Sequence, residues 1–256
     1  MIDLHTHILP DWDDGAVDGT EAASMIEMAR KDGISKICLT PHVFRQTKHG
    51  KGARGLKSRI HKFLKTSNGN GMEFFSGAEV HVQPDIISRI REHGLTINGS
   101  NYVFIEFPAE SLPRGATDLV YRLLLDEFIP IICHPERNAI FVRSPEILYE
   151  MIGQGALGQV TAKSIIGGYG HKTQKAAEVF LRHGLAHFIA SDAHNTNGRP
   201  PRLSKAVKTA AKWVGRAKAE AMVTTVPAAI LNNEHIPNLG ELTLPRRKNL
   251  VHFLFR

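Results

Sequence analysis

Short apolar stretches recur along the chain, and segments with helical spacing lie between them. The apolar stretches cover residues 2–7, 36–40, 73–79, 102–106, 129–134, 157–161 and 186–191. Apolar runs of this length that carry few charges are typical of strands buried in a parallel sheet. The pattern therefore predicts seven strands.

Between these strands, apolar residues recur at three- and four-residue steps. Such spacing is typical of helices with one buried face. The segments that show it are 20–30, 116–127, 144–153, 172–184 and 203–214. Strands that alternate with helices predict a parallel sheet, either open or closed into a barrel. No repeat, low-complexity tract or long linker divides the chain, so we expect one α/β domain over residues 1–256.

The composition is that of a globular protein, with 42% hydrophobic and 22% charged residues in 256 positions. It excludes disordered and fibrous classes. Two cysteines exclude a disulfide scaffold and a cysteine-rich zinc module, and they favour a reducing compartment. No apolar run is long enough to span a membrane. Asp3 and His5 stand where a signal peptide would have its apolar core, so we expect a cytoplasmic location.

The net charge of +7 is concentrated in two separate segments. From Arg199 to the end there are 11 Lys and Arg residues against 3 Asp and Glu. Segment 42–70 has eight basic residues and no acidic one: Arg45, Lys48, Lys51, Arg54, Lys57, Arg59, Lys62 and Lys65. The remainder is acidic. Two separated basic segments are unlike the continuous patch of a nucleic-acid binder, so no nucleic-acid partner is expected.

Segment 202–216 predicts an amphipathic helix with a basic face. Its cations, at three- and four-residue steps, are Arg202, Lys205, Lys208, Lys212 and Arg216, and its apolar residues are Leu203, Val207, Ala210 and Val214. The simplest interpretation is an outer helix with a solvated face. Peripheral contact with an anionic membrane surface is the alternative.

Side chains of the types that can bind metals lie near the carboxyl ends of six of the seven predicted strands. They are His5, His7, Asp13, Asp14, His42, Glu79, His81, Glu106, His134, Asp192 and His194. Function in α/β sheets and barrels is built at that end. Residues i and i+2 of a strand point to the same side, so His5 and His7 can bind one ion together. Imidazoles and carboxylates in this number exceed the needs of one ion, which predicts a polynuclear site.

The motifs resemble those of the polymerase-and-histidinol-phosphatase (PHP) family. They are His5-Thr6-His7, Thr40-Pro41-His42, Gly77-Ala78-Glu79, His134 and Ser191-Asp192-Ala193-His194. The more specific segments 1–10 (MIDLHTHILP), 102–108 (YVFIEFP) and 134–138 (HPERN) resemble the metal-dependent tyrosine phosphatases of bacterial capsule and exopolysaccharide clusters. This resemblance implies a distorted (β/α)7 barrel, with the metal site at the carboxyl ends of its strands.

The resemblance also implies three divalent metal ions, Mn²⁺ first, with Fe, Co²⁺ or Zn²⁺ as alternatives. Its ligands for the first ion would be His5, His7, Glu79 and Asp192. For the second they would be Glu79, Glu106 and His134, with Glu79 bridging the two ions. For the third they would be Asp14, His42 and His194. Acidic residues at positions 14 and 106, where many other PHP proteins have histidines, favour the tyrosine-phosphatase branch over histidinol phosphatase.

The implied reaction is hydrolysis of phosphotyrosine on a bacterial tyrosine kinase that controls polysaccharide synthesis. Arg137 would hold the phosphoryl oxygens, and His194 or a metal-bound water would protonate the leaving group. The alternative for Arg137 is an ion pair with Glu136 or another acid. Arg45 and Arg199 are further candidates for substrate binding. The segment after His42 departs from the branch, which commonly has a second histidine there.

The sequence argues against a cysteine phosphatase. Such an enzyme needs a cysteine and an arginine six positions apart, whereas Cys133 and Arg137 are only four apart. Two other functions remain as alternatives. One is another PHP-type phosphoesterase, acting on histidinol phosphate or a small phosphomonoester. The other is a non-catalytic, metal-bound regulatory module, although no ligand position is missing. The sequence leaves the oligomeric state and the role of a basic loop at 43–65 open. We expect a C-terminal extension, 237–256, to pack on the domain.

Overall fold

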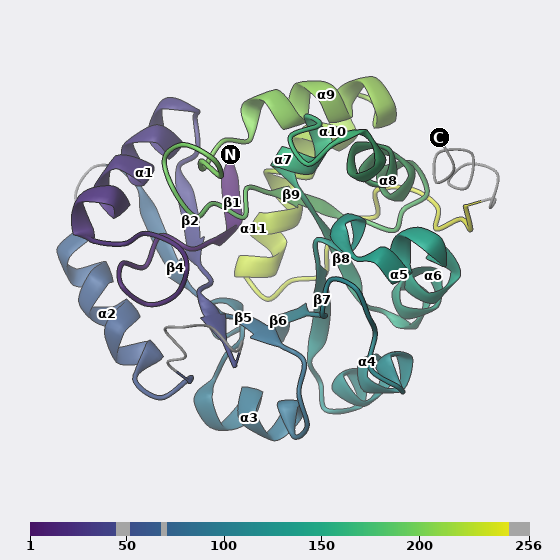
Figure 1. Ribbon diagram of the computed structural model, residues 1–256, viewed down its shortest axis with the longest axis horizontal. Coiled ribbons are helices and arrows are strands. Elements are labelled where there is room, and N and C mark those ends of the chain that lie inside the picture. The colour runs from purple at the N-terminus through teal and green to yellow at the C-terminus, as the bar shows by residue number, and fades with distance from the viewer. Residues whose placement is uncertain (45–51, 68–70, 246–256) are drawn as a thin grey trace.

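The strands run parallel and curl around a common interior (Figure 1). The structure, a computed structural model, describes residues 1–44, 52–67 and 71–245. One sheet has the order β1-β2-β4 and the other β3-β5-β6-β7-β8-β9. The strands are β1 (Ile2–Thr6), β2 (Lys36–Leu39), β3 (His42–Val43), β4 (Glu73–Ser76), β5 (Glu79–His81), β6 (Tyr102–Glu106), β7 (Ile129–Cys133), β8 (Leu157–Thr161) and β9 (Phe188–Ala190).

The parallel α/β class is confirmed, but the expected count of seven strands is not. The stretch 73–79 is divided into β4 and β5 at Gly77, and β3 follows β2 after a break at Pro41. β2 pairs with β4, and β3 pairs with β5, so both breaks fall at the same level. Pro41 has no N–H to donate to a ladder. A Cβ atom on Gly77 would lie 3.1 Å from the side chain of Cys38, so the two strands approach closely here.

The first and last strands lie side by side. An isolated bridge joins Thr6 to Ala193. The backbone N–H of Asp192 donates to the His5 carbonyl at 2.9 Å, and that of His7 donates to the Ala193 carbonyl at 2.8 Å. The carboxyl ends of the first and last strands therefore lie next to each other.

Helices surround the strands (Figure 1). They are α1 (Gly19–Lys31), α2 (Leu56–Ser67), α3 (Ile86–His93), α4 (Ala116–Leu125), α5 (Ala139–Arg143), α6 (Pro145–Gln154), α7 (Ala162–Ile165), α8 (His171–Arg182), α9 (Ser204–Val214), α10 (Arg216–Ala221), α11 (Thr225–Leu231) and the 3₁₀ turns η1 (Ile97–Gly99) and η2 (Pro135–Arg137). The five predicted helices are confirmed as α1, α4, α6, α8 and α9. Within the described part of the chain, no helix has the length and apolarity needed to span a membrane.

Two predictions for the basic segments are wrong in part. The region 43–65, expected as a loop, contains most of α2, whose Leu56 and Ile60 pack into the core. The single helix expected over 202–216 is two helices. Gly215, at φ 86°, separates α9 from α10, and the side chain of Asp32 binds the backbone N–H groups at the start of α9. The apolar stripe of α9 does face inward, with Ala206 and Ala210 buried.

The interior is apolar at the amino ends of the strands. The cluster there includes Ile2, Leu4, Phe104, Ile131, Leu157 and Phe188, and it is joined by Val226 and Ile230 of α11. A second, larger cluster fills the space between strands and helices. In β6, Tyr102 and Phe104 belong to the inner cluster and Val103 and Ile105 to the outer one, as strand alternation requires.

β1 departs from this alternation at a register shift between Asp3 and Thr6. Leu4 belongs to the inner apolar cluster, and the ring of the next residue, His5, packs 4.8 Å from the Phe104 ring. Two consecutive residues thus face the interior. The irregularity lets the strand change from apolar residues to its histidine pair at mid-length.

The C-terminal region is described as far as residue 245. Thr243 exchanges hydrogen bonds with His183 at the end of α8, and Leu239 and Leu242 pack against the core. The apolar stretch 250–255 lies outside the described residues, so packing of the whole extension 237–256 stays a prediction.

Candidate metal centre

The histidine pair of β1 is held in one orientation by hydrogen bonds on the far side of each ring. His5 Nδ1 lies 3.0 Å from Gln159 Oε1, and His7 Nδ1 lies 2.7 Å from Asp13 Oδ2. Both oxygens are acceptors, so each Nδ1 carries the proton. The lone pairs of neutral rings are then on the Nε2 atoms, which lie 3.2 Å apart. This arrangement presents two imidazole nitrogens to a common point, as metal-binding histidines do.

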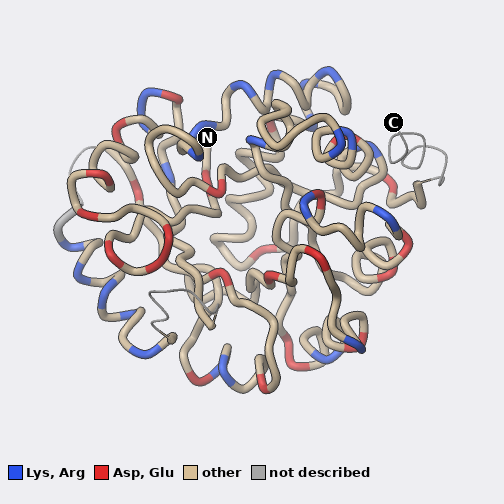
Figure 2. The backbone as a smooth tube through the Cα atoms, viewed as in Figure 1, with Lys and Arg blue, Asp and Glu red and all other residues tan. Residues whose placement is uncertain are grey.

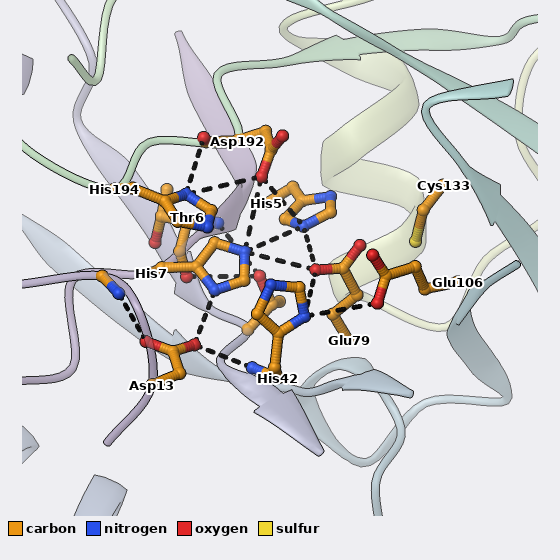
Figure 3. Close-up of polar contacts among 12 residues, drawn as sticks. His5, Thr6, His7, Asp13, His42, Glu79, Glu106, Cys133, Asp192 and His194 are labelled. Carbon is orange, nitrogen blue, oxygen red and sulfur yellow. Dashed lines mark hydrogen bonds and ion pairs between the residues drawn. The ribbon is translucent and has the colours of Figure 1, made fainter. Parts of the chain in front are cut away.

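Two carboxylates complete a fully buried group around that point (Figure 3). Glu79 Oε2 lies 3.2 Å from His5 Nε2 and 3.3 Å from His7 Nε2. Asp192 Oδ1 lies 3.6 Å and 3.4 Å from the same atoms. The four residues are those predicted together for the first ion.

A second group of ligand-type atoms lies on the more open side of His7. It consists of His7, Asp14, His42 and His194. Asp14 Oδ1 is 3.4 Å from His42 Nε2 and 3.5 Å from His194 Nε2, and the Asp14 side chain is 47% exposed. His194 Nδ1 lies 3.0 Å from the backbone carbonyl of Asp192, which leaves Nε2 to face the group. The structure thus brings together the three residues predicted for the third ion.

The third group differs from the predicted ligand set of the second ion. Glu79 and Glu106 lie with His42 rather than with His134. His42 Nδ1 is 2.9 Å from Glu79 Oε2 and 3.5 Å from Glu106 Oε2. His134 Nε2 instead contacts the other oxygen of Glu79, Oε1, at 2.9 Å. His134 and Glu106, the two residues predicted with Glu79 for this ion, both lie near it, and Glu79 belongs to two groups.

The donor set fits divalent cations. Glu79 Oε2, Asp192 Oδ1 and His194 Nε2 are buried and form no hydrogen bond within the described residues. Imidazole nitrogens face the two carboxylate oxygens at short distance, but without hydrogen-bond geometry. Buried polar atoms are rarely left in this state unless an ion or water completes them.

Charge in the centre is balanced by protons on the histidines. Burial lowers the pKa of His7, but the Asp13 carboxylate and its neighbours outweigh burial and raise the pKa well above its usual range. Burial likewise lowers the pKa of His42, but the Glu79 carboxylate outweighs burial and raises this pKa to about 9. For Glu79, burial opposes the charges of His5 and His42, which hold its pKa well below its usual range. Cations that bind here would displace these protons.

His194 behaves differently from His7 and His42. Burial, together with the charge of His7, lowers the pKa of His194 to about 4, although Asp14 opposes the shift. The ring is therefore neutral at pH 7. A neutral ring with Nδ1 hydrogen-bonded to a carbonyl is suited to be a ligand through Nε2.

Two residues of the centre have backbone conformations that side chains rarely adopt. His134 has φ 33° and Asp192 has φ 53°. Both follow a strand, and the left-handed turn directs each side chain back toward the interior. Strained residues of this kind cluster at functional sites.

The HPERN segment distributes its side chains over the centre and its support. Glu136 turns away from Arg137: its Oε1 accepts hydrogen bonds from the Thr161 N–H at 3.0 Å and from the Ser164 hydroxyl at 2.6 Å. Asn138 caps α5 by accepting from two backbone N–H groups. Only His134 and Arg137 of this segment reach the centre.

Two arginines share one carboxylate oxygen at the edge of the centre. Arg137 Nη1 and Arg199 Nη2 each lie 2.5 Å from Asp192 Oδ2. The ion pair expected as the alternative for Arg137 is therefore with Asp192 and not with Glu136. The Arg137 guanidinium also lies over the Tyr169 ring, 4.9 Å from its centroid. Arg45, the other predicted substrate contact, lies outside the described residues.

Several residues outside the three predicted ligand sets support the centre. Asp13 holds His7 and also accepts the backbone N–H of His42 at 2.8 Å. Gln159 is the one polar side chain between Leu157 and Val160, and this isolated polar position in a buried strand was a usable signal. His81, a further candidate ligand, contacts Glu106 Oε2 at 3.2 Å. A Cβ atom on Gly15 would lie 2.0 Å from the His7 carbonyl, so only glycine fits there.

Several known proteins are similar to this chain in sequence. A family model described as capsular polysaccharide synthesis, CpsB/CapC, matches residues 1–232. The tyrosine-protein phosphatase YwqE of Bacillus subtilis is 32% identical over 97% of this chain and 98% of its own. CapC of Staphylococcus aureus is 36% identical over 78% of this chain and 79% of its own. The tyrosine-protein phosphatase CpsB of Streptococcus agalactiae is 27% identical over 92% of this chain and 100% of its own.

A solved structure extends the similarity to three dimensions. It comes from work on YwqE of Bacillus subtilis and CpsB of Streptococcus pneumoniae, described as unique metal-dependent tyrosine phosphatases. It superimposes with a TM-score of 0.83 at 30% identity, over 96% of this chain and 100% of that one. A β-aspartyl dipeptidase from Fervidobacterium islandicum AW-1 shares only the fold, with a TM-score of 0.54 at 15% identity, over 90% of this chain and 72% of that one.

Proposed function

The chain belongs to the capsular polysaccharide synthesis CpsB/CapC family, and we propose that it is a metal-dependent protein-tyrosine phosphatase. Its substrate would be phosphotyrosine on a bacterial tyrosine kinase that controls capsular or exopolysaccharide synthesis. The observation that carries the proposal is the buried group of imidazoles and carboxylates with two arginines at its edge. Membership of the family confirms the resemblance seen in the motifs.

We propose three divalent cations, Mn²⁺ first, held by the residues around Glu79. His5, His7, Glu79 and Asp192 would hold one cation, and Asp14, His42 and His194 another. Glu79, Glu106 and His134 would hold the remaining one, because His134 Nε2 contacts Glu79 Oε1 and Glu106 lies in one ligand group with Glu79. Cations bound there would neutralise phosphoryl oxygens and lower the pKa of a water nucleophile toward neutral pH.

Arg137 and Arg199 would bind and orient the phosphoryl group. Both guanidiniums are anchored on Asp192, so their planes are fixed before substrate arrives. Each retains N–H donors that point away from this carboxylate, since a guanidinium has five. Tyr169, which lies against Arg137, restricts the side chain further. Donors placed in advance cost no reorganisation in the transition state.

The leaving group needs less help than the phosphoryl group. The phenol of tyrosine has a solution pKa of about 10, far below that of an alkyl alcohol. His194 is neutral and has Nδ1 bound to a carbonyl, which favours its role as a ligand. Its second predicted role, protonation of the leaving group, stays a prediction.

A cysteine nucleophile is disfavoured. Burial, followed by the charges of Glu79 and Glu106, raises the pKa of the Cys133 thiol well above its usual range. Burial also raises the pKa of Cys38. Neither buried thiol offers the accessible thiolate that such an enzyme requires.

We also propose that the two sheets together form the distorted (β/α)7 barrel of the PHP family. β2 with β3, and β4 with β5, would each be one bent strand, which gives seven in all. The seam between β1 and Ala193 supports this interpretation, because it joins the first strand to the last.

The test measures phosphate release from p-nitrophenyl phosphate, a phosphotyrosyl peptide and histidinol phosphate, with Mn²⁺ and with excess chelator. We expect chelator-sensitive hydrolysis of the first two and little of the third. Arg137→Lys should lower kcat/KM by about a hundredfold, because it keeps the charge but loses the planar fork. Arg143→Lys, at an exposed position of α5, is the matched control. Hydrolysis that survives the chelator, or a preference for histidinol phosphate, would contradict the proposal.

A further inference from the structure

A cavity adjoins the metal centre between α1, α7 and α9. Its volume is about 500 Å³, within the range of small-ligand sites. Ser191, next to Asp192, lines it, and so does Arg199, whose Nη2 binds Asp192. The cavity therefore begins where the substrate's phosphoryl group would be held.

The wall of the cavity is strongly basic. Besides Arg199 it has four cations: Lys31, Lys163, Arg202 and Lys205. Lys and Arg positions also recur along α9 at the top of Figure 2. Lys31 has a carboxylate partner, Glu27, at 3.4 Å. Within the described part of the chain, Lys163, Arg202 and Lys205 have no carboxylate within ion-pair distance.

Among the described residues that line the cavity, Asp32 is the one acidic residue. Oδ2 accepts the backbone N–H groups of Leu203 at 2.7 Å and Ser204 at 2.9 Å, and Oδ1 accepts the Ser204 hydroxyl at 2.5 Å. It caps α9, and its single negative charge offsets only one of the positive charges on the wall. The cavity thus has an excess of positive charge that the described residues do not balance.

Two contacts connect the cavity with the metal centre. Lys163 Nζ lies 4.5 Å from the centroid of the Tyr169 ring. The Arg137 guanidinium lies over the same ring. Arg199 spans both sites, and its buried Nε has no hydrogen-bond acceptor within the described residues. A ligand in the cavity would therefore lie beside a bound phosphoryl group, separated from it by one or two side chains.

Part of the cavity lining is apolar. Met28, Ala162, Ile166 and Ala206 belong to it, and Ile166 is 46% exposed. A free inorganic anion would gain nothing from these apolar side chains. A side chain with carbon atoms and an anionic end would bury the former on it and direct the latter to the cations.

We propose that this cavity is a second substrate subsite, which binds an anionic side chain adjacent in sequence to the phosphotyrosine. The proposal rests on the phosphatase function proposed above. The ligand class is a carboxylate or a second phosphate group on the same polypeptide. The subsite selects among phosphotyrosines by their neighbours, which the metal centre alone cannot do.

The test compares three phosphotyrosyl peptides: one flanked by asparagines, one by aspartates, and one by a second phosphotyrosine. We expect kcat/KM for the better anionic peptide to exceed that for the neutral peptide by about tenfold at low salt, and the ratio to shrink at high salt. Whichever anionic peptide gives the larger ratio identifies the group that the subsite takes.

Variants then locate the preference. Arg202→Ala/Lys205→Ala should lower the ratio by about fivefold or more. Lys163→Met, from a different helix, should lower it independently. Lys212→Ala removes an exposed cation of α9 that does not line the cavity, and it should keep the ratio. Because the ratio compares two substrates on one protein, a partly unfolded variant does not change it.

The outcomes separate this proposal from the previous one. A lack of hydrolysis of all three peptides would overturn the phosphatase function itself. Hydrolysis with the same ratio in the wild type, the double variant and Lys212→Ala would overturn the subsite alone. An unchanged ratio with loss of binding to phosphatidylserine vesicles would instead assign these cations to a membrane surface.

Discussion

Two histidines at opposite ends of the strands have pKa values shifted in opposite directions. His187, just before β9, is partly buried, and burial with the charge of Lys218 lowers its pKa to about 4. His7, just after β1, is fully buried, yet carboxylates raise its pKa well above the usual range. Burial disfavours the charged ring in both places, so the carboxylates make the difference. Apolar packing therefore dominates at the amino ends of the strands, and charged groups are concentrated at their carboxyl ends.

The largest expected effect comes from removing the carboxylate that the ligand groups share. Glu79→Gln replaces an anion that faces four imidazoles with a neutral amide. We expect kcat/KM on p-nitrophenyl phosphate to fall by about ten-thousandfold, or about 5 kcal/mol. Metal content, measured by elemental analysis, should fall as well.

Glu73→Gln is the matched control for this substitution, since Glu73 is an exposed carboxylate on β4. It should keep both activity and metal content. A Glu79→Gln protein that retains its metal and loses less than about tenfold in kcat/KM would show that metal binding and activity do not depend on this residue.

A substitution at the apolar end should change stability instead. Phe188→Ala removes a fully buried ring that packs 6.1 Å from the Phe104 ring. We expect the free energy of unfolding to fall by about 4 kcal/mol, and Phe188→Leu to lose less. Denaturant titration measures the change. If the comparison holds, kcat/KM of the remaining folded protein stays near that of the wild type; a loss as large as that of Glu79→Gln would contradict it.

The smallest effect concerns pH. Because the folded pKa of His187 lies below its unfolded value of 6.5, the native state binds fewer protons than the unfolded state between pH 6.5 and 4. The stability that depends on neutral His187 is present above pH 6.5 and is lost as the pH falls. We expect a loss of about 2 kcal/mol between pH 6.5 and 5.

His187→Asn should reduce this loss. The asparagine oxygen can replace Nδ1, which accepts the Gly158 N–H at 3.0 Å, but it takes up no proton. His235→Asn, at an exposed position, should leave the pH dependence unchanged. Parallel stability curves for the wild type and His187→Asn would show that burial at this end does not govern the titration.

Much of the fold was predictable because parallel strands buried on both faces have continuous apolar runs. The division of strands at Pro41 and Gly77 was not, since it depends on how closely two distant segments approach. The register shift in β1 was hidden for the same reason. α2 could have been predicted: Leu56, Ile60 and Leu64 have helical spacing, but its basic residues suggested a loop.

The candidate ligands were predictable from their places at strand ends, and the structure brings them together. Their grouping was not, because it depends on side-chain rotation: His42 turns Nδ1 toward Glu79 and Glu106, whereas His134 was the histidine expected with that pair. The contact of Arg137 with Asp192 joins positions 55 residues apart. No local pattern encodes such a contact.

The seam between the first and last strands has a consequence for the polymer as a whole. Asp3 binds the Ser191 N–H across 188 positions, and the proposed ligands His5 and Asp192 lie beside this pair. A cation bound across the seam would close a loop of more than two thirds of the chain. In the unfolded ensemble a cross-link over so long a loop removes conformational entropy equivalent to about 5 kcal/mol. The ion that takes part in catalysis would therefore also stabilise the fold, as a disulfide bond does in secreted proteins, but reversibly.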